Sequence, residues 1–534
     1  MAKLAALADA RATGDAQVTG VTHASTGVRP GDLYAALPGA RRHGSEFIPG
    51  AKAAGAVAVL TDPAGAAAAA AAGLPALIVP DPRAVLGTVA SAIYGDPTGT
   101  PTDVRDGDPT GTPTDVRDGD PTGTPTDVRG GDPTGIAATA ENEAEDEDKG
   151  LIVIGITGTA GKTSTAYLIE SGLRAAGHVT GLIGTVETRL GDLAVDSVRT
   201  TPEATDLHAL LAAARERGVT AVVMEVSSHA LVMGRVGGVR FAVGGYTNFG
   251  LDHLDFHADA DDYFAAKAKL FDGRCRVEIL NHDDPALAPL RKPATVTYSA
   301  VGDPQATWWS TDVRGTAYAQ LFMAHGPDGA VAAGVALPGR HNVANALLAI
   351  AALAAVGIDP ATAARGVAAC PGVPGRLERV DAPGPVLGVV DYAHKPDAIV
   401  AALTALRDLA AARGGQVICV IGAGGDRDRS KRPLMGAAAA HGADLVVVTD
   451  DNPRTEDPAA IRREVLAGTA GASAKVIEVA GRRAAIDEAV RLAAPGDVVA
   501  VLGKGHERGQ DVGGAVLPFD DRVELAAALS EGNA

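Results

Sequence analysis

The stretch LIVIGITGTAGKTSTAYL, residues 151–168, decides the fold of the region around it. Its first part, LIVIGIT, is an apolar run typical of a buried parallel strand. The strand leads straight into GTAGKTS, where Gly158 and Gly161 permit a tight backbone path before a helix that begins at about residue 162. Backbone N–H groups at such a helix start can point at phosphate oxygens, and Lys162 would neutralise nucleotide phosphates. The stretch therefore predicts a phosphate-binding loop.

The loop fits the short pattern TGTxGKT, because Ile156 stands where the longer GxxxxGK[ST] pattern needs glycine. Thr163 would offer a hydroxyl to Mg²⁺. A chance glycine-rich turn is the alternative, and the strand before the loop and the helix after it argue against that alternative. The residues assigned to the loop are Gly158, Thr159, Ala160, Gly161, Lys162, Thr163 and Ser164.

Length and composition limit the class of protein. The 534 residues are enough for about three domains. The chain has 47 Lys and Arg against 65 Asp and Glu, and this net charge of −18 disfavours non-specific binding to nucleic acid or an anionic membrane. Its three cysteines lie far apart without metal-finger spacing, as in a reducing compartment. With neither a signal-peptide core nor an apolar run of about 18 residues, we expect a cytoplasmic protein without a membrane span. We also expect it to act as a monomer.

A low-complexity segment occupies residues 95–149. Three near-identical twelve-residue units begin GDPTGTPTDVR, and the acidic run ENEAEDEDK follows them. One Val per unit is too little apolar surface for a stacked repeat, so the segment predicts a disordered linker. A calcium-binding Asp repeat is the alternative, but the Gly/Asp spacing of such repeats is absent.

Strands that alternate with helices predict an α/β fold of three domains with mostly parallel sheets. The domains would cover residues 1–94, 150–372 and 373–534. The predicted strands are 55–60, 76–80, 151–157, 220–226, 388–393, 416–423, 443–450 and 497–503, and the main helices would begin near 162, 342, 396 and 431. In such sheets ligands bind beyond the carboxyl ends of the strands, where the motifs of this chain lie.

The segment TGTAGKTS resembles the ATP loop of the Mur ligase family, and the similarity extends over most of the chain outside the linker. The resemblance implies an ATP-dependent amide-bond ligase that phosphorylates a substrate carboxylate. It also implies a UDP-binding N-terminal α/β domain, a central P-loop ATPase-like domain and a Rossmann-like C-terminal domain.

Three charged residues are the candidates for metal binding. Glu225 ends a predicted buried strand, where a charge is costly unless it is paired or bound to metal. His253 and Lys267 follow in TNFGLDHLDFH and DDYFAAKAKLF, and each by itself would more often be a solvated surface residue. The resemblance implies that Thr163, Glu225 and His253 bind Mg²⁺ and that Lys267 is carbamylated by CO₂. Lys269 would point about 200° away round the same helix.

The resemblance also assigns residues to the two nucleotide-bearing substrates. Segments PGRHNVANA, PGRLERV and DYAHKP imply ATP contacts by Asn342, Asn345, Arg376 and Asp391, with His394 nearby. The residues implied for the UDP-MurNAc-peptide are Ser25, Thr200, Thr201, Ser227 and Arg235. In the uridine segment HASTGVRPGDLY, Ala24 and Thr26 stand where the family usually has Asp and Arg, and Leu251 replaces an arginine that many relatives have beside His253.

The C-terminal segment DNPR resembles the signature of family members that add diaminopimelate. Diaminopimelate has a distal carboxylate that lysine lacks, and Arg454 can form a bidentate contact with it. The residues implied for diaminopimelate are Arg427, Asp451, Asn452, Pro453, Arg454, Gly503 and Glu507. A solvated turn is the alternative for DNPR alone.

The sequence thus predicts a ligase that adds meso-diaminopimelate to UDP-MurNAc-L-Ala-D-Glu through an acyl phosphate, with Lys162, Glu225, His253 and Lys267 as its catalytic residues. A lysine-adding or D-Ala-D-Ala-adding sister enzyme is one alternative. A non-catalytic nucleotide-binding descendant is another, although loss of Lys162, Glu225 or Lys267 would be expected there, and all three are present.

Overall fold

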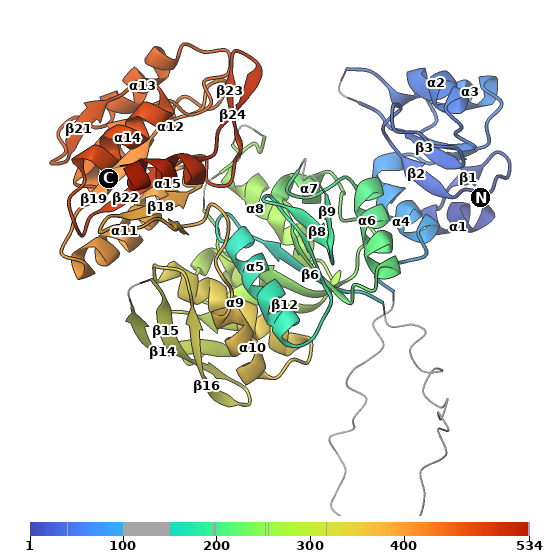
Figure 1. Ribbon diagram of the computed structural model, residues 1–534. Helices are drawn as coiled ribbons and strands as arrows, with labels where there is room; N and C mark the ends of the chain where they lie inside the picture. The colour runs from blue at the N-terminus through green and yellow to red at the C-terminus, as the bar shows by residue number, and fades with distance from the viewer. Residues whose placement is uncertain are drawn as a thin grey trace, which may run out of the picture.

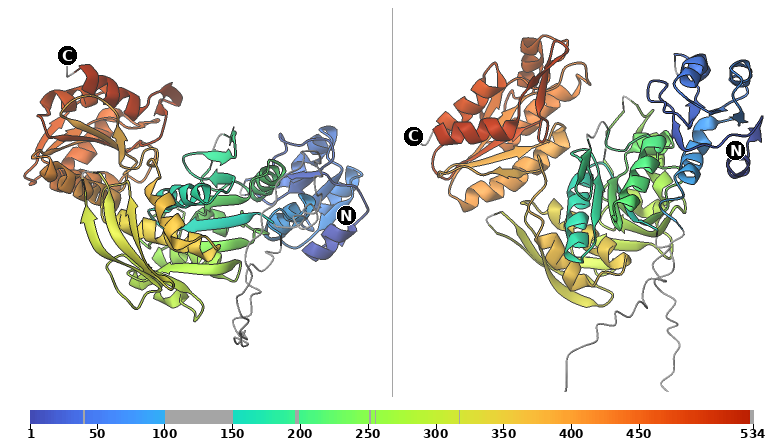
Figure 2. Two further views of the ribbon diagram at one scale, coloured as in Figure 1. Left: turned by 60° about the horizontal axis from the view of Figure 1, so that its bottom comes forward. Right: turned by 45° about the vertical axis from the view of Figure 1, so that its right-hand side comes forward.

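Three α/β domains follow one another along the chain, and the N-terminal and C-terminal domains lie at opposite ends of the central one (Figures 1 and 2). The computed structural model describes residues 1–39, 41–99, 150–195, 199–250, 252–254, 256–316 and 318–531. Residues 100–149 of the predicted linker lie outside the described residues, and so does Leu251. The linker and the alternative of a calcium-binding repeat therefore stay predictions.

The N-terminal domain has a five-stranded sheet of order β1-β5-β4-β3-β2, in which only β1 is antiparallel to its neighbour. Its elements are β1 (Arg11–Ala12), β2 (Gly20–Thr22), β3 (Asp32–Ala36), β4 (Ala58–Thr61), β5 (Ala76–Ile78), α1 (Ala2–Ala8), η1 (Gly44–Phe47), α2 (Ile48–Ala53), α3 (Ala66–Ala71) and α4 (Pro82–Ile93). Successive aliphatic residues of β4 point into two cores, one on each face: Ala58 and Leu60 into one, and Val59 into the other.

The central domain has an eleven-stranded sheet of order β16-β15-β14-β13-β12-β11-β6-β10-β7-β8-β9. Its parallel part carries the strands that precede the site residues: β6 (Ile152–Thr157), β7 (Thr180–Ile183), β10 (Ala221–Glu225), β11 (Phe241–Tyr246), β12 (Cys275–Asn281) and β13 (Val296–Ser299). At either end the sheet continues through antiparallel strands: β8 (Thr188–Leu190), β9 (Leu193–Val195), β14 (Trp308–Gly315), β15 (Gln320–Gly326) and β16 (Gly329–Val335).

Helices pack on both faces of this sheet. They are α5 (Lys162–Ala175), α6 (Ala204–Glu216), α7 (Ser228–Val232), α8 (Ala260–Ala268), η2 (Lys269–Phe271), η3 (Pro285–Leu290), α9 (His341–Ala355) and α10 (Pro360–Ala368). The Ala- and Leu-rich α9 is almost wholly buried between the sheet and its neighbours α5 and α10, which explains why its sequence is apolar on every side.

The C-terminal domain has a sheet of order β17-β18-β22-β19-β20-β21, parallel except for β17. Its elements are β17 (Glu378–Val380), β18 (Leu387–Asp391), α11 (Pro396–Ala412), β19 (Val417–Ile421), α12 (Lys431–Gly442), β20 (Leu445–Val448), α13 (Pro458–Ala467), β21 (Lys475–Glu478), α14 (Arg482–Leu492), β22 (Val498–Leu502), the hairpin β23 (Gly509–Val512) and β24 (Ala515–Pro518), and α15 (Asp521–Glu531).

The central domain meets its two neighbours at two boundaries, and one contact illustrates each boundary. Helix α4 packs against α6, and a Cβ built on Gly87 would lie 2.2 Å from the carbonyl oxygen of Gly237, so the two backbones touch where neither residue has a side chain. On the other side, the loop between β14 and β15 reaches the C-terminal domain, where the Tyr318 hydroxyl donates to the carbonyl oxygen of Leu377.

The predicted α/β fold with three domains is confirmed, and each predicted strand and helix has a counterpart shifted by at most a few residues. The strands β14 to β16 were not predicted, although β15 and β16 contain the short apolar runs LFMA and AVAAGV. None of the helices in the described parts of the chain is both long and apolar enough to cross a membrane.

Arg482→Ala tests what holds the carboxyl edge of the C-terminal sheet together. Both Arg482 and Asp521 have fully buried side chains, joined by two contacts of 2.7 Å, and Arg482 also donates to the Leu502 carbonyl at the end of β22. Removing the arginine leaves a buried carboxylate without its partner, which should cost about 3–5 kcal/mol. Calorimetry should show a lower unfolding temperature. As a control, Arg491→Ala removes the exposed ion pair with Glu488 and should change stability by less than about 1 kcal/mol. An equal loss of stability in the two variants would contradict the expectation.

Candidate functional site

The phosphate loop has the predicted position between β6 and α5. Gly158 and Gly161 have φ angles of 138° and 85°, and a Cβ at Gly158 would lie 1.8 Å from Thr247 Oγ1. Only glycine therefore fits there. Lys162 Nζ donates to the carbonyl oxygens of Gly158 at 2.9 Å and Thr159 at 3.2 Å, so its ammonium lies folded back over the loop.

Residues that follow β11 brace the loop from one side. Asn248 accepts from the backbone N–H groups of Thr159, through its carbonyl at 2.9 Å, and of Ala160, through its side chain at 3.1 Å. The amides of Gly161, Lys162 and Thr163 at the start of α5 remain as the anion-binding end of this helix.

Asn345 braces the loop from α9. A Cβ at Gly161 would lie 2.6 Å from Asn345 Oδ1, and Thr165 Oγ1 donates to the same oxygen at 3.4 Å. The Asn345 amide donates to Asn342 Oδ1 at 2.9 Å. The two asparagines therefore connect the PGRHNVANA segment to the loop, whereas Ser164 is buried in the first turn of α5.

Glu225 is the central carboxylate of the site. It is 1% exposed at the end of β10. Thr163 donates to Oε1 at 3.1 Å, and Thr185 donates to the carboxylate through its backbone N–H at 2.8 Å and its hydroxyl at 3.2 Å. Thr201 Oγ1 donates to the Glu225 backbone carbonyl at 2.9 Å. The carboxylate thus ties the phosphate loop to the segment that follows β7, while the backbone carbonyl of Glu225 holds Thr201.

His253 and Asp252 form a second charged group beside the loop. His253 has a φ of 54°, and its Nε2 lies 3.0 Å from Asp252 Oδ2. Burial would raise the pKa of Asp252, but Lys395 and His253 outweigh this effect and hold it at about 2. Burial lowers the pKa of His253 to about 4, against the opposing field of Asp252. The imidazole is therefore neutral, which is the form that binds metal.

Lys267 is the buried lysine of α8, and Lys269 is exposed two residues later. Its Nζ donates to the Gly158 carbonyl at 2.8 Å and lies 4.6 Å from the centroid of the Tyr263 ring. Burial and the nearby Lys162 ammonium lower the pKa of Lys267 well below that of a free lysine. A neutral amine at this position can act as a nucleophile.

These donors suit Mg²⁺ rather than a metal that needs a complete protein cage. Among the described residues, no group of three or more His, Cys, Asp and Glu side chains gathers to hold an ion. Mg²⁺ is usually bound by one or two carboxylates together with substrate phosphates and waters. The buried Glu225 carboxylate next to the Thr163 hydroxyl fits that requirement.

The C-terminal domain places further residues against the phosphate loop. Arg376 Nη2 donates to Thr163 Oγ1 at 3.2 Å, and its guanidinium lies 4.5 Å from the Tyr392 ring centroid. Asp391 is buried and accepts from the backbone N–H groups of Leu377 and Ala393. Burial raises the pKa of Asp391, partly offset by Arg376. The hydrogen bond of His394 stays within its own segment, because its Nδ1 lies 2.7 Å from the Tyr392 carbonyl oxygen.

The predicted amino-acid pocket lies at the carboxyl edge of the C-terminal sheet. A Cβ built on Gly424 would lie 3.0 Å from Arg454 Nη1 and 3.8 Å from Arg427 Cγ, so both arginines flank this glycine. Arg454 has a φ of 52° and donates to the Gly425 carbonyl at 2.7 Å. The structure therefore brings the two predicted arginines together.

Glu507 is held next to Asn452 of the predicted amino-acid site. Its Oε2 accepts from Asn452 Nδ2 and from the fully buried Lys504, both at 3.0 Å. Asp451 lies beside Gly503, because a Cβ there would be 2.6 Å from Asp451 Oδ2. The Pro453 carbonyl packs against Gly425. Asn452 and Lys504 thus fix the orientation of the Glu507 carboxylate.

The residues predicted for the UDP-MurNAc-peptide extend from the N-terminal domain to Glu225. Ser25 lies half-buried in the turn after β2, two residues from His23, whose Nδ1 is 3.3 Å from Thr205 Oγ1. The hydroxyl oxygens of Thr200 and Thr185 lie 3.1 Å apart. Thr201 accepts from the Ser227 backbone N–H at 3.1 Å.

Arg235 joins this row through an ion pair inside the protein. Its Nη2 lies 2.8 Å from Glu203, and its Nη1 donates to the Thr201 carbonyl at 3.3 Å. Its buried Nε has no hydrogen-bond partner. Arg235 therefore holds the 201–203 segment in place.

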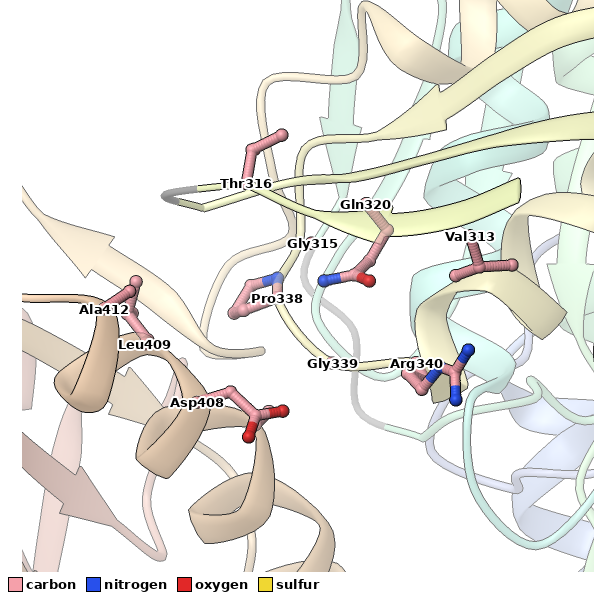
Figure 3. A pocket seen from close by; sticks show the side chains of 11 residues that line it. Val313, Gly315, Thr316, Gln320, Pro338, Gly339, Arg340, Asp408, Leu409 and Ala412 are labelled. Atoms are coloured by element: carbon pink, nitrogen blue, oxygen red, sulfur yellow. The ribbon is translucent and has the colours of Figure 1, made fainter.

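A cavity of about 490 Å³ lies between the central and C-terminal domains (Figure 3). Its walls are the β14–β15 hairpin with Gln320, the segment Pro338–Arg340 that precedes α9, and α11 with Asp408. None of the residues assigned to metal or amino-acid binding lines it.

Four residues of the site escaped the sequence analysis: Thr185, Tyr392, Lys395 and His506. Lys395 Nζ forms an ion pair with Asp252 across the domain boundary. The ring of His506 lies 5.1 Å from that of Tyr392, and burial together with Arg376 lowers its pKa to about 4. The sequence offers only one indication for three of them: Tyr392 and Lys395 lie in DYAHKP, and His506 lies in GKGHE (residues 503–507). No sequence motif indicates Thr185.

Comparison with known proteins gives the family. Residues 17–94 match the description "Mur ligase family, catalytic domain", residues 156–353 the "Mur ligase middle domain" and residues 375–505 the "Mur ligase, glutamate ligase domain". A Streptomyces coelicolor protein named UDP-N-acetylmuramoyl-L-alanyl-D-glutamate–2,6-diaminopimelate ligase is 50% identical, over 99% of this chain and 96% of its own length. The chain belongs to the Mur ligase family.

The other similarities agree with this assignment. A solved structure with the same ligase name superposes with a TM-score of 0.64 at 28% identity, over 98% of this chain and 97% of the other. A Leifsonia xyli protein, 40% identical over 97% of this chain and 95% of its own length, is named only UDP-N-acetylmuramyl-tripeptide synthetase. This chain is an ATP-dependent, amide-bond-forming Mur ligase of peptidoglycan precursor synthesis.

Lys162→Met should abolish ATP turnover and yet stabilise this Mur ligase. Burial, opposed in part by Glu225, lowers the pKa of Lys162 from 10.5 to about 8. The folded state therefore disfavours the charged form at every pH below about 8, and the penalty fades as the pH rises from there to about 10.5. The variant should gain up to about 3 kcal/mol near neutral pH and lose this advantage at high pH.

Thermal unfolding of both proteins across this pH range checks the expectation. The exposed Lys269→Met should change stability by less than about 0.5 kcal/mol. A Lys162→Met variant that is less stable than the wild type at neutral pH would show that the hydrogen bonds of Lys162 outweigh its burial.

Proposed function

We propose that this Mur ligase adds meso-diaminopimelate to UDP-MurNAc-L-Ala-D-Glu. The observation that carries the proposal is the meeting of Arg427 and Arg454 at Gly424, beside Glu507. Two arginines can bind a distal carboxylate, and Glu507 can bind an ammonium, which together match diaminopimelate. Lysine would leave the arginines without a partner, and an unpaired charged group is penalised.

The nucleotide-sugar end of the substrate is expected to lie near Ser25 in the N-terminal domain. Thr200, Thr201, Ser227 and Arg235 lead from there toward Glu225, because Thr201 bonds both Ser227 and the Glu225 carbonyl. This row supports a binding mode in which the D-Glu carboxylate lies beside the phosphate loop.

ATP is the proposed phosphoryl donor, held by the loop residues Gly158 to Ser164. Lys162 and the helix amides would bind its phosphates, and Arg376 would reach them from the C-terminal domain. Asn342, Asn345 and Asp391 are assigned to its nucleoside part, with the two asparagines already placed against Gly161.

Thr163, Glu225, His253 and carbamylated Lys267 would hold Mg²⁺. The ion would supply charge stabilisation as the γ-phosphate leaves ADP. Buried beside the Gly158 carbonyl, the neutral Lys267 amine can add to CO₂, and the carbamate formed would reverse its charge from cation to anion.

Two chemical steps follow from this arrangement. The D-Glu side-chain carboxylate attacks the γ-phosphate, ADP departs, and an acyl phosphate forms. The amine of diaminopimelate, oriented by Glu507 and the arginines, then attacks the acyl carbon; phosphate leaves and the amine loses a proton. We propose that the enzyme acts as a monomer in the cytoplasm, where ATP and UDP-sugars are available.

Parallel assays with three amino acceptors test the choice of substrate. ADP release with ATP and UDP-MurNAc-L-Ala-D-Glu should require meso-diaminopimelate, and neither L-lysine nor D-Ala-D-Ala should replace it. Arg454→Leu should lower kcat/KM for diaminopimelate by about 10- to 100-fold, since it removes a hydrogen bond between charged groups.

The matched control is Arg429→Leu, an exposed arginine two residues after Arg427, in the loop between β19 and α12, that pairs with Glu464. It should leave the choice of acceptor unchanged. A wild-type preference for lysine would reject diaminopimelate as the substrate, and an equal response of the Arg429 and Arg454 variants would remove Arg454 from the pocket.

Carbamylation of Lys267 has a direct spectroscopic test. Wild-type protein in ¹³C-labelled bicarbonate should show a carbamate carbon resonance, because burial lowers the pKa of Lys267 and leaves a neutral amine. Lys267→Met should lose the resonance together with ATP turnover. Lys269→Met, at the exposed neighbour, should keep both; a resonance that survives in Lys267→Met would place the carbamate elsewhere.

A further inference from the structure

Lys395 connects the C-terminal domain directly to the loop that carries His253. It stands at the N-cap of α11, and its Nζ forms an ion pair with Asp252 of the central domain. The side chain of Asp252 is 3% exposed and that of Lys395 is 24% exposed. Water and salt therefore screen this pair only weakly, so that it contributes more to domain contact than an ion pair on the surface would.

Asp252 shares one oxygen between Lys395 and His253. The same Oδ2 that pairs with Lys395 lies 3.0 Å from His253 Nε2. Its position fixes the imidazole through one ring nitrogen and leaves Nδ1 for another ligand. A carboxylate that binds the second nitrogen of a metal-binding histidine sets the orientation of the ring and raises its basicity.

Lys395 also adds positive charge at the phosphate loop. Its field contributes to the lowered pKa values of Lys162 and Lys267, so the three lysine side chains lie near one another. Arg376, from the same domain, reaches Thr163 of the loop. Both interdomain cations reach the loop only while the C-terminal domain lies against the central one.

We propose that Lys395 is a positioning residue that couples closure of the C-terminal domain to the orientation of His253. This inference rests on the proposed magnesium site. In the closed state Lys395 neutralises Asp252 and holds it against His253. When the C-terminal domain moves away, Asp252 loses this partner and His253 loses its fixed orientation, so that the site is complete only around bound substrates.

The test compares Lys395→Met, which removes the charge but keeps the length, with Lys395→Arg, which keeps the charge. Lys475→Met, at an exposed lysine on the edge strand β21, is the control. Domain closure is measured without metal or nucleotide, by energy transfer between dyes on Val301→Cys and Val523→Cys. These two positions are exposed, whereas the native cysteines are all buried, so the dyes attach selectively.

The wild type and Lys475→Met should be closed and should stay largely closed as salt is added, because a buried ion pair is only weakly screened, whereas Lys395→Met should be open at every salt concentration. In turnover assays Lys395→Met should need roughly 10- to 100-fold more Mg²⁺ for half-maximal rate, at an unchanged KM for diaminopimelate. Lys395→Arg should restore both properties. The double variant with Asp252→Asn and Lys395→Met should lose little more closure than Asp252→Asn alone, because the two side chains act as one unit.

Two results overturn the inference: a Lys395→Met variant with wild-type closure, or one with a wild-type Mg²⁺ requirement. Full additivity with Asp252→Asn would do the same. Failure of the proposed function is distinguishable, since a wild-type enzyme that turns over without Mg²⁺ removes the magnesium site itself, whatever the variants do.

Discussion

The buried carboxylate of Glu225 is the constraint on which the active region depends. A charge that is 1% exposed at the end of a strand is stable only if donors surround it, and here they come from two separate segments, the phosphate loop with Thr163 and the stretch after β7 with Thr185. Thr201 secures the backbone carbonyl of the same residue. The side chain and the backbone of one residue therefore align the phosphate loop with the segment that carries Thr201. Such a requirement explains why a charged residue interrupts an otherwise aliphatic strand.

The carboxyl edges of two parallel sheets supply nearly every functional group. In the central domain, β6, β7, β10 and β11 all end at the phosphate loop, and in the C-terminal domain the ends of β18, β19, β20 and β22 carry the amino-acid residues. The two edges face each other across the domain boundary, where Arg376 contacts Thr163. Under the proposed function, the edge of the central sheet would bind the nucleotide and the carboxylate, and the edge of the C-terminal sheet would bind the amine.

Much of this could be predicted from the sequence because periodic apolar runs and short motifs are local signals. LIVIGIT followed by GTAGKTS was enough for β6, the loop and α5, whereas the assignment of Glu507 and Arg454 to one site came from the family resemblance of the C-terminal segments. Contacts between distant segments carry no local signal. Neither the pairing of Lys395 with Asp252 nor that of Thr185 with Glu225 could be found, since each depends on how two domains or two strands meet. Arg235 shows the same limit, because its bond to Glu203 appears only in the folded chain.

The touching backbones of Gly87 and Gly237 limit what the boundary between the first two domains can accommodate. A Cβ at Gly87 would lie 2.2 Å from the Gly237 carbonyl oxygen, and a backbone atom cannot turn aside as the end of a flexible side chain can. Any larger residue at this position would therefore have to push α4 away from the turn after α7. A single added methyl group would thus shift the N-terminal domain against the central one.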